Sequence, residues 1–229
     1  MRSRSIAHYP ASFALICLMI AGAGCSALAP VLLVMDMMGV DDKANIKYKF
    51  DKNAKRVAVV VHLAKQPTTD IGHFDRDVAN LLAMKIANYT NKKPEVVVSS
   101  KVQKWMDEHQ DWKTPSEIGR GVNADYVIFV EIRRLSFYEK EGWTQFYKGN
   151  CEATVSVHHV GEDDAEETVL PFEPTSCSIR FPAGMKPMTD ADLTLPQFRS
   201  LFIRHTAERL SWIFVPHATN LEYGDDKSN

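Results

Sequence analysis

A continuous run of β-branched residues near position 60 places the tightest constraint on how this chain can fold. Arg56 to Leu63 reads Arg-Val-Ala-Val-Val-Val-His-Leu, without alternation of apolar and polar residues. A strand of this composition is buried on both faces, as is typical of a sheet that is covered by helices. The run therefore predicts an interior strand in a fold that combines strands and helices.

Helical and strand periodicity alternate through the rest of the chain. The segment from Phe74 to Tyr89 carries apolar residues at helical spacing, which gives it one apolar face. Further helices are predicted over 99–109, 114–121 and 194–214, and further strands over 95–98, 125–138, 143–160 and 168–181. The resulting order, β-α-β-α-α-β-β-β-α, predicts an α/β (α+β) domain with one mixed sheet of about five strands and helices packed on it.

Local signals predict how three of these helices begin and what the last one buries. Thr114 and Thr194 stand three residues before Glu117 and Gln197, which is the spacing of a capping box. One of the serines at 99–100 is expected to cap the helix over 99–109. The last helix is expected to bury five apolar side chains: Phe198, Leu201, Phe202, Leu210 and Ile213.

The N-terminus has the features of an export signal. A short cationic segment over 2–4 is followed by an apolar segment over 11–20 and by small residues before Cys25. The sequence Ala23-Gly24-Cys25 resembles the end of the bacterial lipobox. This resemblance implies attachment of diacylglycerol to Cys25, cleavage after Gly24, and acylation of the new N-terminus with a fatty acid such as palmitate. Lipid would then hold the chain at a membrane.

Two other fates of the leader are compatible with the same residues. Ordinary cleavage after the Ala-Gly-Ala at 21–23 would release a soluble protein. An uncleaved leader would be a signal anchor, because residues 11–40 carry Asp36 as their only charge and are long enough to cross a bilayer as a helix.

The residue after the cysteine bears on which membrane would hold a lipidated chain. Ser26 stands where Asp would be the usual signal for retention in the inner membrane. In a cell with two membranes the outer membrane is therefore expected, with the domain facing the periplasm. The 229 residues then divide into a signal peptide over 1–24, a lipidated N-terminus and tether over 25–55, an α/β domain over 56–217 and a polar tail over 218–229.

Two of the four cysteines, Cys151 and Cys177, lie in the predicted domain. If the acidic turn over 161–167 is a hairpin centred on Asp164, the two cysteines lie directly opposite each other on apolar faces of neighbouring strands. An exported protein meets an oxidising compartment, so a disulfide is expected. The alternatives are two buried thiols, separated by a register shift at the nearby prolines, and a reactive thiol or a metal site.

Other candidate sites have simpler structural explanations. Adjacent strand residues point to opposite faces, so the pair His158-His159 cannot share a metal. The acidic residues over 73–77 suit the start of a helix, and those over 162–167 a solvated turn. The lysines between 92 and 104 are interpreted as a solvated face. The alternative is that they contact anionic lipid or cell-wall polymer. A net charge of −2 gives no reason to expect nucleic acid.

Motifs for phosphate binding, nucleophilic hydrolysis and zinc proteolysis are missing from the sequence. We therefore expect no metal, no cofactor and no enzymatic activity, with an unrecognised hydrolase as the alternative.

Two tracts carry a resemblance to known proteins. Arg56-Val-Ala-Val-Val-Val is followed, after a helix and a second strand, by Asn123-Ala-Asp-Tyr-Val-Ile-Phe-Val-Glu-Ile132. This order resembles planctomycete lipoproteins of no assigned function. More distantly, it is similar to periplasmic α/β domains of the curli-secretion lipoprotein, the penicillin-binding-protein activator lipoprotein and the N-terminal domain of TolB. The resemblance implies a non-enzymatic envelope protein that binds other proteins or the cell wall.

The sequence therefore favours an envelope lipoprotein that acts as a scaffold or accessory through protein contacts. One alternative is a lipoprotein that binds a small molecule or polysaccharide in an aromatic groove. The aromatic residues available for such a groove are Trp105, Trp112, Trp143, Phe146 and Tyr147. Another alternative is a signal-anchored membrane protein with the same domain.

Overall fold

The computed structural model describes residues 46–51, 54–65, 72–90, 94–141, 144–161, 174–182, 188–189 and 192–217. The chain divides into two units, Met1–Asp42 and Lys43–Asn229, and every element below belongs to the second. The leader and Cys25 lie outside the described residues.

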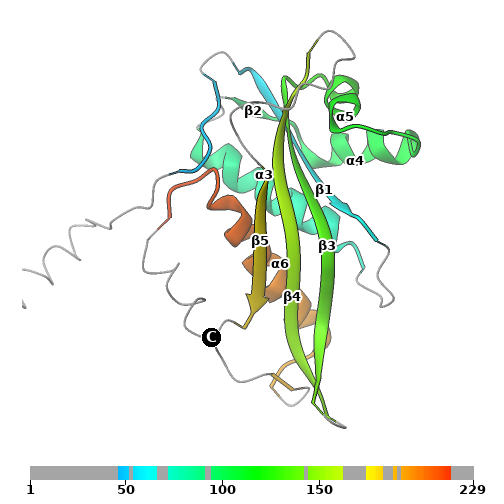
Figure 1. Cartoon of the computed structure of the whole chain (residues 1–229), viewed down its shortest axis with the longest axis vertical. Helices are drawn as coiled ribbons and strands as arrows, with labels where there is room; N and C mark the ends of the chain where they lie inside the picture. Colours follow the sequence, from blue (N-terminus) through cyan, green and yellow to red (C-terminus); the bar gives the residue numbers. More distant parts are fainter. Residues whose placement is uncertain are drawn as a thin grey trace, which may run out of the picture. The chain divides into compact units, whose positions relative to one another are not determined.

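Five strands and four helices make up the described part of the domain, in the order that the sequence predicts. The strands are β1 (Arg56–Leu63), β2 (Glu95–Val96), β3 (Tyr126–Glu141), β4 (Thr144–His159) and β5 (Thr175–Phe181). The helices are α3 (Phe74–Tyr89), α4 (Ser99–Glu108), α5 (Pro115–Val122) and α6 (Leu195–Ser211). The strands form one mixed sheet in the order β2-β1-β3-β4-β5, which confirms the predicted architecture (Figure 1).

The direction of the strands changes in the middle of the sheet. β1 is parallel to both β2 and β3, because helical connections return the chain to the same end of the sheet. β3, β4 and β5 form an antiparallel meander, in which β3 and β4 are long strands of 16 residues each. The pairing of β3 with β4 is irregular between Ile132 and Arg134 and between Ser136 and Tyr138.

The larger hydrophobic core lies between one face of the sheet and helices α3 and α6. Alternate residues of β1 and β4, among them Val59 and Val155, meet Leu82 of α3 and Phe202 of α6. The large side chains at its centre are fully buried: Phe74, Phe137, Phe198 and Phe202. Since aromatic side chains bury the largest apolar areas, these phenylalanines dominate the stabilisation of this core.

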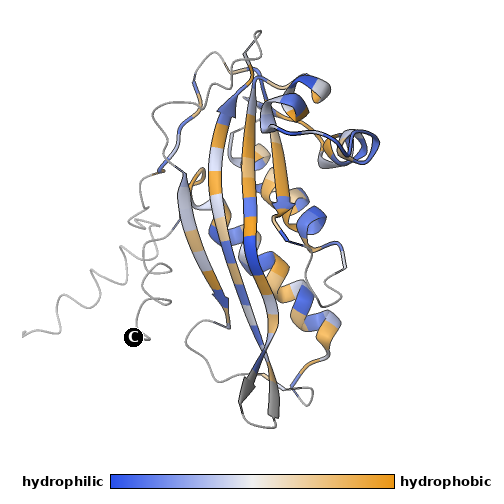
Figure 2. Ribbon diagram, turned by 45° about the vertical axis from the view of Figure 1, so that its right-hand side comes forward, coloured by the Kyte–Doolittle hydropathy of each residue, from blue (hydrophilic) through white to orange (hydrophobic). Residues whose placement is uncertain are grey.

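A smaller core lies on the opposite face, where α4 and α5 cover β1 and the start of β3. Val60 of β1 and Val127 of β3 pack there against Val102 of α4 and Ile118 of α5. β1 is therefore covered on both faces, as its composition predicts. β4 is striped instead: from Lys148 to His158 every second residue is polar, so apolar and polar colours alternate along this part of the strand (Figure 2).

Several local predictions differ from the structure. The N-cap of α4 is Val98, without a side-chain hydrogen bond, so the predicted serine cap is wrong. The helix begins one residue earlier than that prediction requires, which places Ser99 and Ser100 in its first turn. Leu201 is 38% exposed rather than buried, whereas the other four residues predicted for the core of α6 are buried.

Both predicted capping positions are used. Thr114 Oγ1 accepts a hydrogen bond from Glu117 N–H at 3.4 Å, but the Glu117 carboxylate accepts from the backbone of Lys113 rather than of Thr114. At α6, Gln197 Oε1 accepts from the Thr194 N–H at 2.9 Å. Polar side chains thus satisfy N–H groups at the starts of both helices.

Residues before β1 also contribute to the domain. Tyr48 is buried in the larger core, and its N–H donates to the Ile213 carbonyl at 3.0 Å. Its ring packs edge-on against Phe50 and Phe214. The domain therefore includes part of the segment before the first strand, which the sequence analysis assigned to the tether.

Candidate functional site

Cys25 lies outside the described residues, as do Trp143 and most of the acidic turn. Within the described part of the chain, no helix is both long and apolar enough to span a membrane.

The two domain cysteines lie on neighbouring strands but not opposite each other. Cys177 pairs with Ala153, and Cys151 pairs with Ile179, so the predicted direct opposition is wrong. The observed pairs are symmetric about position 165 instead of 164, so the centre assumed for the hairpin is one position too early. The shift moves the pairing by two residues, which keeps both cysteines on the predicted apolar face.

Both thiols are unbonded, and burial disfavours the thiolate form of each. Burial raises the pKa of the Cys151 thiol to about 12, and Cys177 and Glu152 act in the same direction. Burial also raises the pKa of Cys177, against the opposing charges of Lys47 and Arg209. Since the thiolate is the nucleophile, neither cysteine has the electronic character of a catalytic residue at neutral pH.

The adjacent histidines lie on opposite faces of β4, as predicted. The His158 ring packs edge-on against Phe129, and the His159 ring packs edge-on against Tyr126. His158 Nε2 also lies 2.8 Å from Ser156 Oγ. The sequence analysis missed this contact, although residues two apart on a strand share a face. Among the described residues, no three His, Cys, Asp or Glu side chains come together as a metal site would require.

The aromatic residues proposed for a binding groove lie in separate places. Trp105 stacks on His109 at 4.4 Å between ring centroids, and Tyr147 is buried in the larger core. Trp112 packs edge-on against His62 and Phe129, and both it and Trp105 lie against the smaller core, on the opposite face of the sheet from Tyr147. Trp105, Trp112 and Tyr147 therefore do not line one groove.

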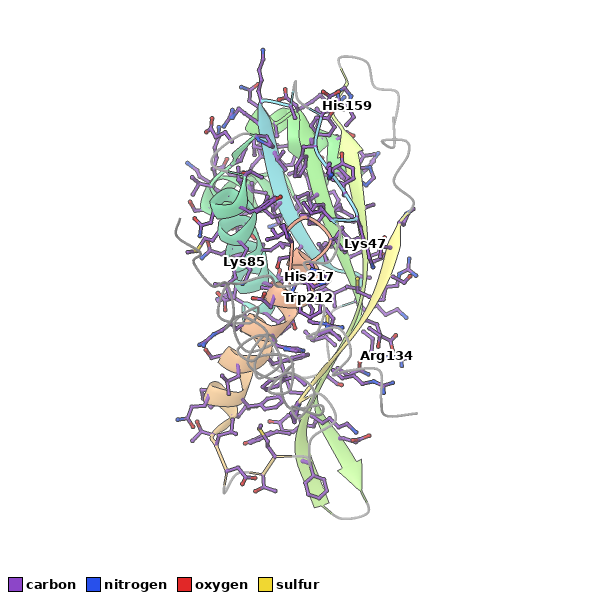
Figure 3. The ribbon with its side chains drawn as sticks, turned by 90° about the vertical axis from the view of Figure 1, so that its left-hand side faces the viewer. Lys47, Lys85, Arg134, His159, Trp212 and His217 are labelled. Atoms are coloured by element: carbon purple, nitrogen blue, oxygen red, sulfur yellow. The ribbon has the colours of Figure 1, made fainter. Side chains whose placement is uncertain are left out.

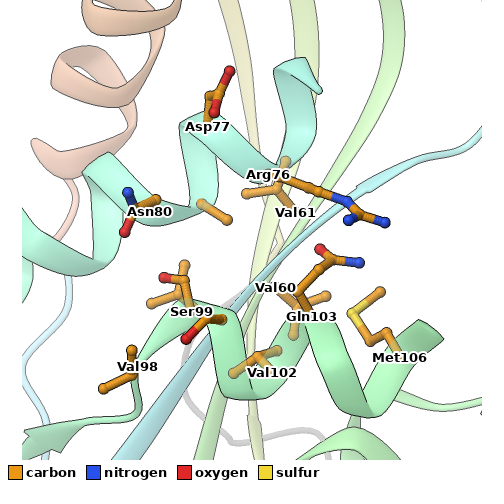
Figure 4. A pocket seen from close by; sticks show the side chains of 13 residues that line it. Val60, Val61, Arg76, Asp77, Asn80, Val98, Ser99, Val102, Gln103 and Met106 are labelled. Atoms are coloured by element: carbon orange, nitrogen blue, oxygen red, sulfur yellow. The ribbon is translucent and has the colours of Figure 1, made fainter. Parts of the chain in front are cut away.

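A pocket of about 300 Å³ lies instead beside β1, between α3 and α4. Three consecutive β1 residues line it, namely Val59, Val60 and Val61. α3 contributes Arg76, Asp77, Ala79 and Asn80, and α4 with the residue before it contributes Val98, Ser99, Ser100, Val102, Gln103 and Met106. Figure 4 shows the α3 and α4 side chains facing each other across the strand. None of the lining residues is aromatic.

An ion pair joins the two helices next to this pocket. Arg76 Nη2 donates to Asp107 Oδ1 at 2.9 Å, and Gln103 Nε2 donates to the same oxygen at 3.1 Å. The ion pair is exposed and adds little stability by itself. It links α3 and α4 on the two sides of the pocket. Sequence periodicity alone does not reveal such a site, because it depends on the spacing of two helices.

No protein-family model matches the sequence, and no curated protein matches it. Solved structures resemble the chain distantly. PelC from Paraburkholderia phytofirmans, crystallised as a dodecamer, matches 75% of this chain and 94% of its own at 13% identity and a TM-score of 0.40. The lipoprotein GNA1162 from Neisseria meningitidis matches 64% of this chain and 92% of its own at 10% identity and a TM-score of 0.39.

A third structure, the protein XCC0632 from Xanthomonas campestris, matches 75% of this chain and 87% of its own at 11% identity and a TM-score of 0.31. These TM-scores are too low for the likenesses to carry a functional argument. The resemblance to planctomycete, curli-secretion, penicillin-binding-protein-activator and TolB-type proteins stays a prediction.

Proposed function

We propose that this chain is a membrane-anchored lipoprotein of the bacterial cell envelope that acts, without enzymatic activity, as a scaffold or accessory through protein contacts. The observation that carries the proposal is the leader, which ends in Ala23-Gly24-Cys25 and precedes a folded domain. A lipid on Cys25 would confine the domain to a membrane surface, where it meets other envelope proteins and the cell wall. Ser26 favours the outer membrane, with the domain in the periplasm.

Crosslinking in intact cells tests this proposal. The full chain is crosslinked, purified from envelope fractions and compared with a Cys25→Ser variant, which cannot carry the thioether lipid. The wild-type chain should recover defined envelope proteins, and the variant should recover them at a much lower level because it is not held at the same surface. Repeated failure of the wild-type chain to recover any envelope partner would contradict a scaffold role.

A further inference from the structure

β5 forms one margin of the sheet, and among the described residues no strand pairs with its outer edge (Figure 1). Three of its residues, Ser176, Ser178 and Arg180, are exposed. Of the described helices and strands, β4 packs against its inner edge and α6 against one of its faces. The outer edge of β5 is therefore accessible to another molecule, in contrast to the buried strand β1.

The hydrogen-bond ladder determines which backbone groups of β5 point outward. The Val160 N–H donates to the Asp125 carbonyl, so even-numbered residues at this end of β4 direct their backbone groups to β3. Odd-numbered residues such as Ala153 direct theirs to β5, where Ala153 pairs with Cys177. Since the direction alternates along a strand, the even-numbered residues of β5 direct their N–H and C=O groups outward.

The outward residues of β5 are Ser176, Ser178 and Arg180, and a proline follows the same alternation at each end. Pro174 and Pro182 stand just before and just after the strand, also at even-numbered positions. Proline is tolerated where an N–H would face away from the ladder, because no ladder hydrogen bond is lost. The prolines also limit the outer edge to three residues, which suits a short extended segment.

Cations flank this edge on both faces of the sheet. Arg180 lies on the face opposite the larger core, since its neighbour Ile179 is buried in that core. On the core side, the charges of Lys47 and Arg209 act on Cys177 and oppose the rise of its pKa, so both cations lie near the strand. Lys47 and Arg180 are exposed, and neither forms an ion pair with a described carboxylate.

This charge distribution indicates which kind of partner fits. Glu152 lies opposite Ser178 on β4, but it is already paired with Arg134 at 3.1 Å. Two copies of this chain that paired through β5 about Ser178 would bring the Lys47 and Arg209 of both copies together. Like charges that meet across a ladder are destabilising, whereas opposite charges add to the pairing. The edge therefore suits a negatively charged strand better than a second copy.

We propose that the outer edge of β5 binds an extended, acidic peptide segment of a partner protein, which adds to the sheet as a further strand. The segment would exchange backbone hydrogen bonds with Ser176, Ser178 and Arg180. Acidic side chains on one face of the added strand would meet Arg180, and those on the other face would meet Lys47 and Arg209. The backbone would supply affinity, and the charges would select the sequence.

The first experiment uses random peptides as the probe. The full-length chain, purified in detergent, is used to select binders from a displayed library, and synthetic copies are measured by calorimetry. The selected peptides should be rich in Asp and Glu, and their affinity should fall as the salt concentration rises. A library that yields no binders, or binders without acidic residues, would overturn the proposal.

Ser178→Pro tests whether these peptides bind at the edge of β5. The substitution removes the central outward N–H but no hydrogen bond to β4, so it should weaken binding about tenfold or more while the domain stays folded. Ser178→Ala is the matched control, because it keeps the N–H and should leave the affinity unchanged. Circular dichroism melts of both variants check the fold. Peptides that bind the proline variant as tightly as the wild type would place the site elsewhere.

Charge reversal tests the selection of acidic sequences without altering the backbone. Arg180→Glu should weaken the binding of acidic peptides about fivefold or more. Lys104→Glu makes the same change in net charge on α4, where the Lys104 side chain is 76% exposed, and should have little effect. Equal losses in the two variants would mean that the net charge of the chain, rather than the edge of β5, attracts the peptides.

Methylation of each peptide amide in turn tests strand addition directly, because it removes one N–H donor at a time. Binding should weaken at alternate positions only, since alternate residues of an added strand direct their N–H to β5. Loss of affinity without this period of two would overturn strand addition. Sedimentation of the chain without peptide tests the other occupant: a dimer that Ser178→Pro converts to a monomer would assign the edge to a second copy and overturn the proposal.

The inference rests on the proposed function only for the origin of the peptide in an envelope protein. The peptide experiments need neither lipid nor membrane, whereas the crosslinking experiment depends on Cys25. Failure of the anchor and failure of the peptide site therefore give different results.

Discussion

Asp125 shows how one side chain can join distant parts of the chain. Its Oδ2 accepts from the backbone N–H of Lys55 at 2.7 Å and of Arg56 at 2.8 Å. Its own N–H donates to the Arg56 carbonyl at 2.9 Å. These bonds fix the start of β1 beside the start of β3, about 70 residues further along the chain.

We expect Asp125→Ala to destabilise the domain by about 1–3 kcal/mol, because two N–H groups lose their acceptor. Asp125→Asn keeps one carbonyl oxygen and should recover most of that loss. Urea unfolding of the wild type and the two variants measures the effect. Equal destabilisation by alanine and asparagine would show that the carboxylate charge, rather than the acceptor, is responsible.

Glu208 forms the polar contact between α3 and α6. It is paired with Lys85, and its Oε1 accepts from Trp212 Nε1 at 3.3 Å. Figure 3 labels the two partners, Lys85 and Trp212. Burial alone would raise the pKa of Glu208, but the hydrogen bond and charge of Lys85, the bond from Trp212 and the charge of His205 lower it below the ordinary value of 4.5. The folded state therefore favours the ionised carboxylate.

This shift makes part of the stability depend on pH. A lowered folded pKa contributes stability above the unfolded value of 4.5, and that contribution is lost as pH falls through the folded pKa. Glu208→Gln should therefore reduce the free energy of unfolding at neutral pH, by under about 1 kcal/mol because the pair is partly exposed. The difference in the free energy of unfolding between the wild type and the variant should become smaller as the pH falls. A difference that is constant with pH would contradict the ion pair as its cause.

At the scale of elements, α5 approaches the sheet closely at Gly119. A Cβ there would lie 2.7 Å from Val127 Cγ2 and closer still to Val160 Cγ2. Gly119 is buried against Val127 of β3 and against Val160, which follows β4, so glycine is required for close contact rather than for backbone conformation.

We expect Gly119→Ala to destabilise the domain by about 1–3 kcal/mol through overpacking, despite the better helix propensity of alanine. Val160→Ala removes one of the two obstructing groups. In a double-mutant cycle, the pair of substitutions should cost less than the sum of the single changes. Strict additivity would mean that α5 relaxes away from β4 instead.

The elements themselves were predictable because their signals are local. The apolar run of β1, the spacing along α3 and the Thr114 and Thr194 caps each act within a few residues. The register that places Cys151 and Cys177 was not predictable. It depends on how β4 and β5 are connected, and no local sequence pattern determines the register across a connection of more than ten residues. The length of β2 was overestimated for a related reason: Val97 and Val98 have strand propensity, but the packing of α4 on β1 turns the chain away from the sheet.

The pocket was not predictable from the sequence at all. A run of valines on β1 shows that both faces are buried but says nothing about the edge of the strand. The pocket forms beside β1 because β2 is short and because α3 and α4 stand on the two sides of the strand. Both conditions depend on tertiary packing, so neither composition nor residue spacing predicts the pocket.

At the scale of the whole molecule, the proposed lipid decides where the domain acts. Intact-mass measurement of the native protein should give a chain that begins at Cys25 and carries diacylglycerol and an N-terminal acyl chain. Cys25→Ser should lose the mass of the thioether lipid. A wild-type chain that begins at Met1 would indicate a signal anchor, and one that begins at Gly24 without lipid would indicate ordinary secretion.

The one-sided burial of β4 also has a consequence for how freely this protein can vary. Cys151, Ala153 and Val155 face the larger core, whereas Glu152 and Thr154 between them face away from it. In a library of single substitutions, the first set should tolerate few replacements and the second set nearly all, as judged by the yield of folded protein. The number of tolerated substitutions should therefore alternate from one residue of β4 to the next. A uniform profile would mean that another molecule covers the polar face of β4 in the cell.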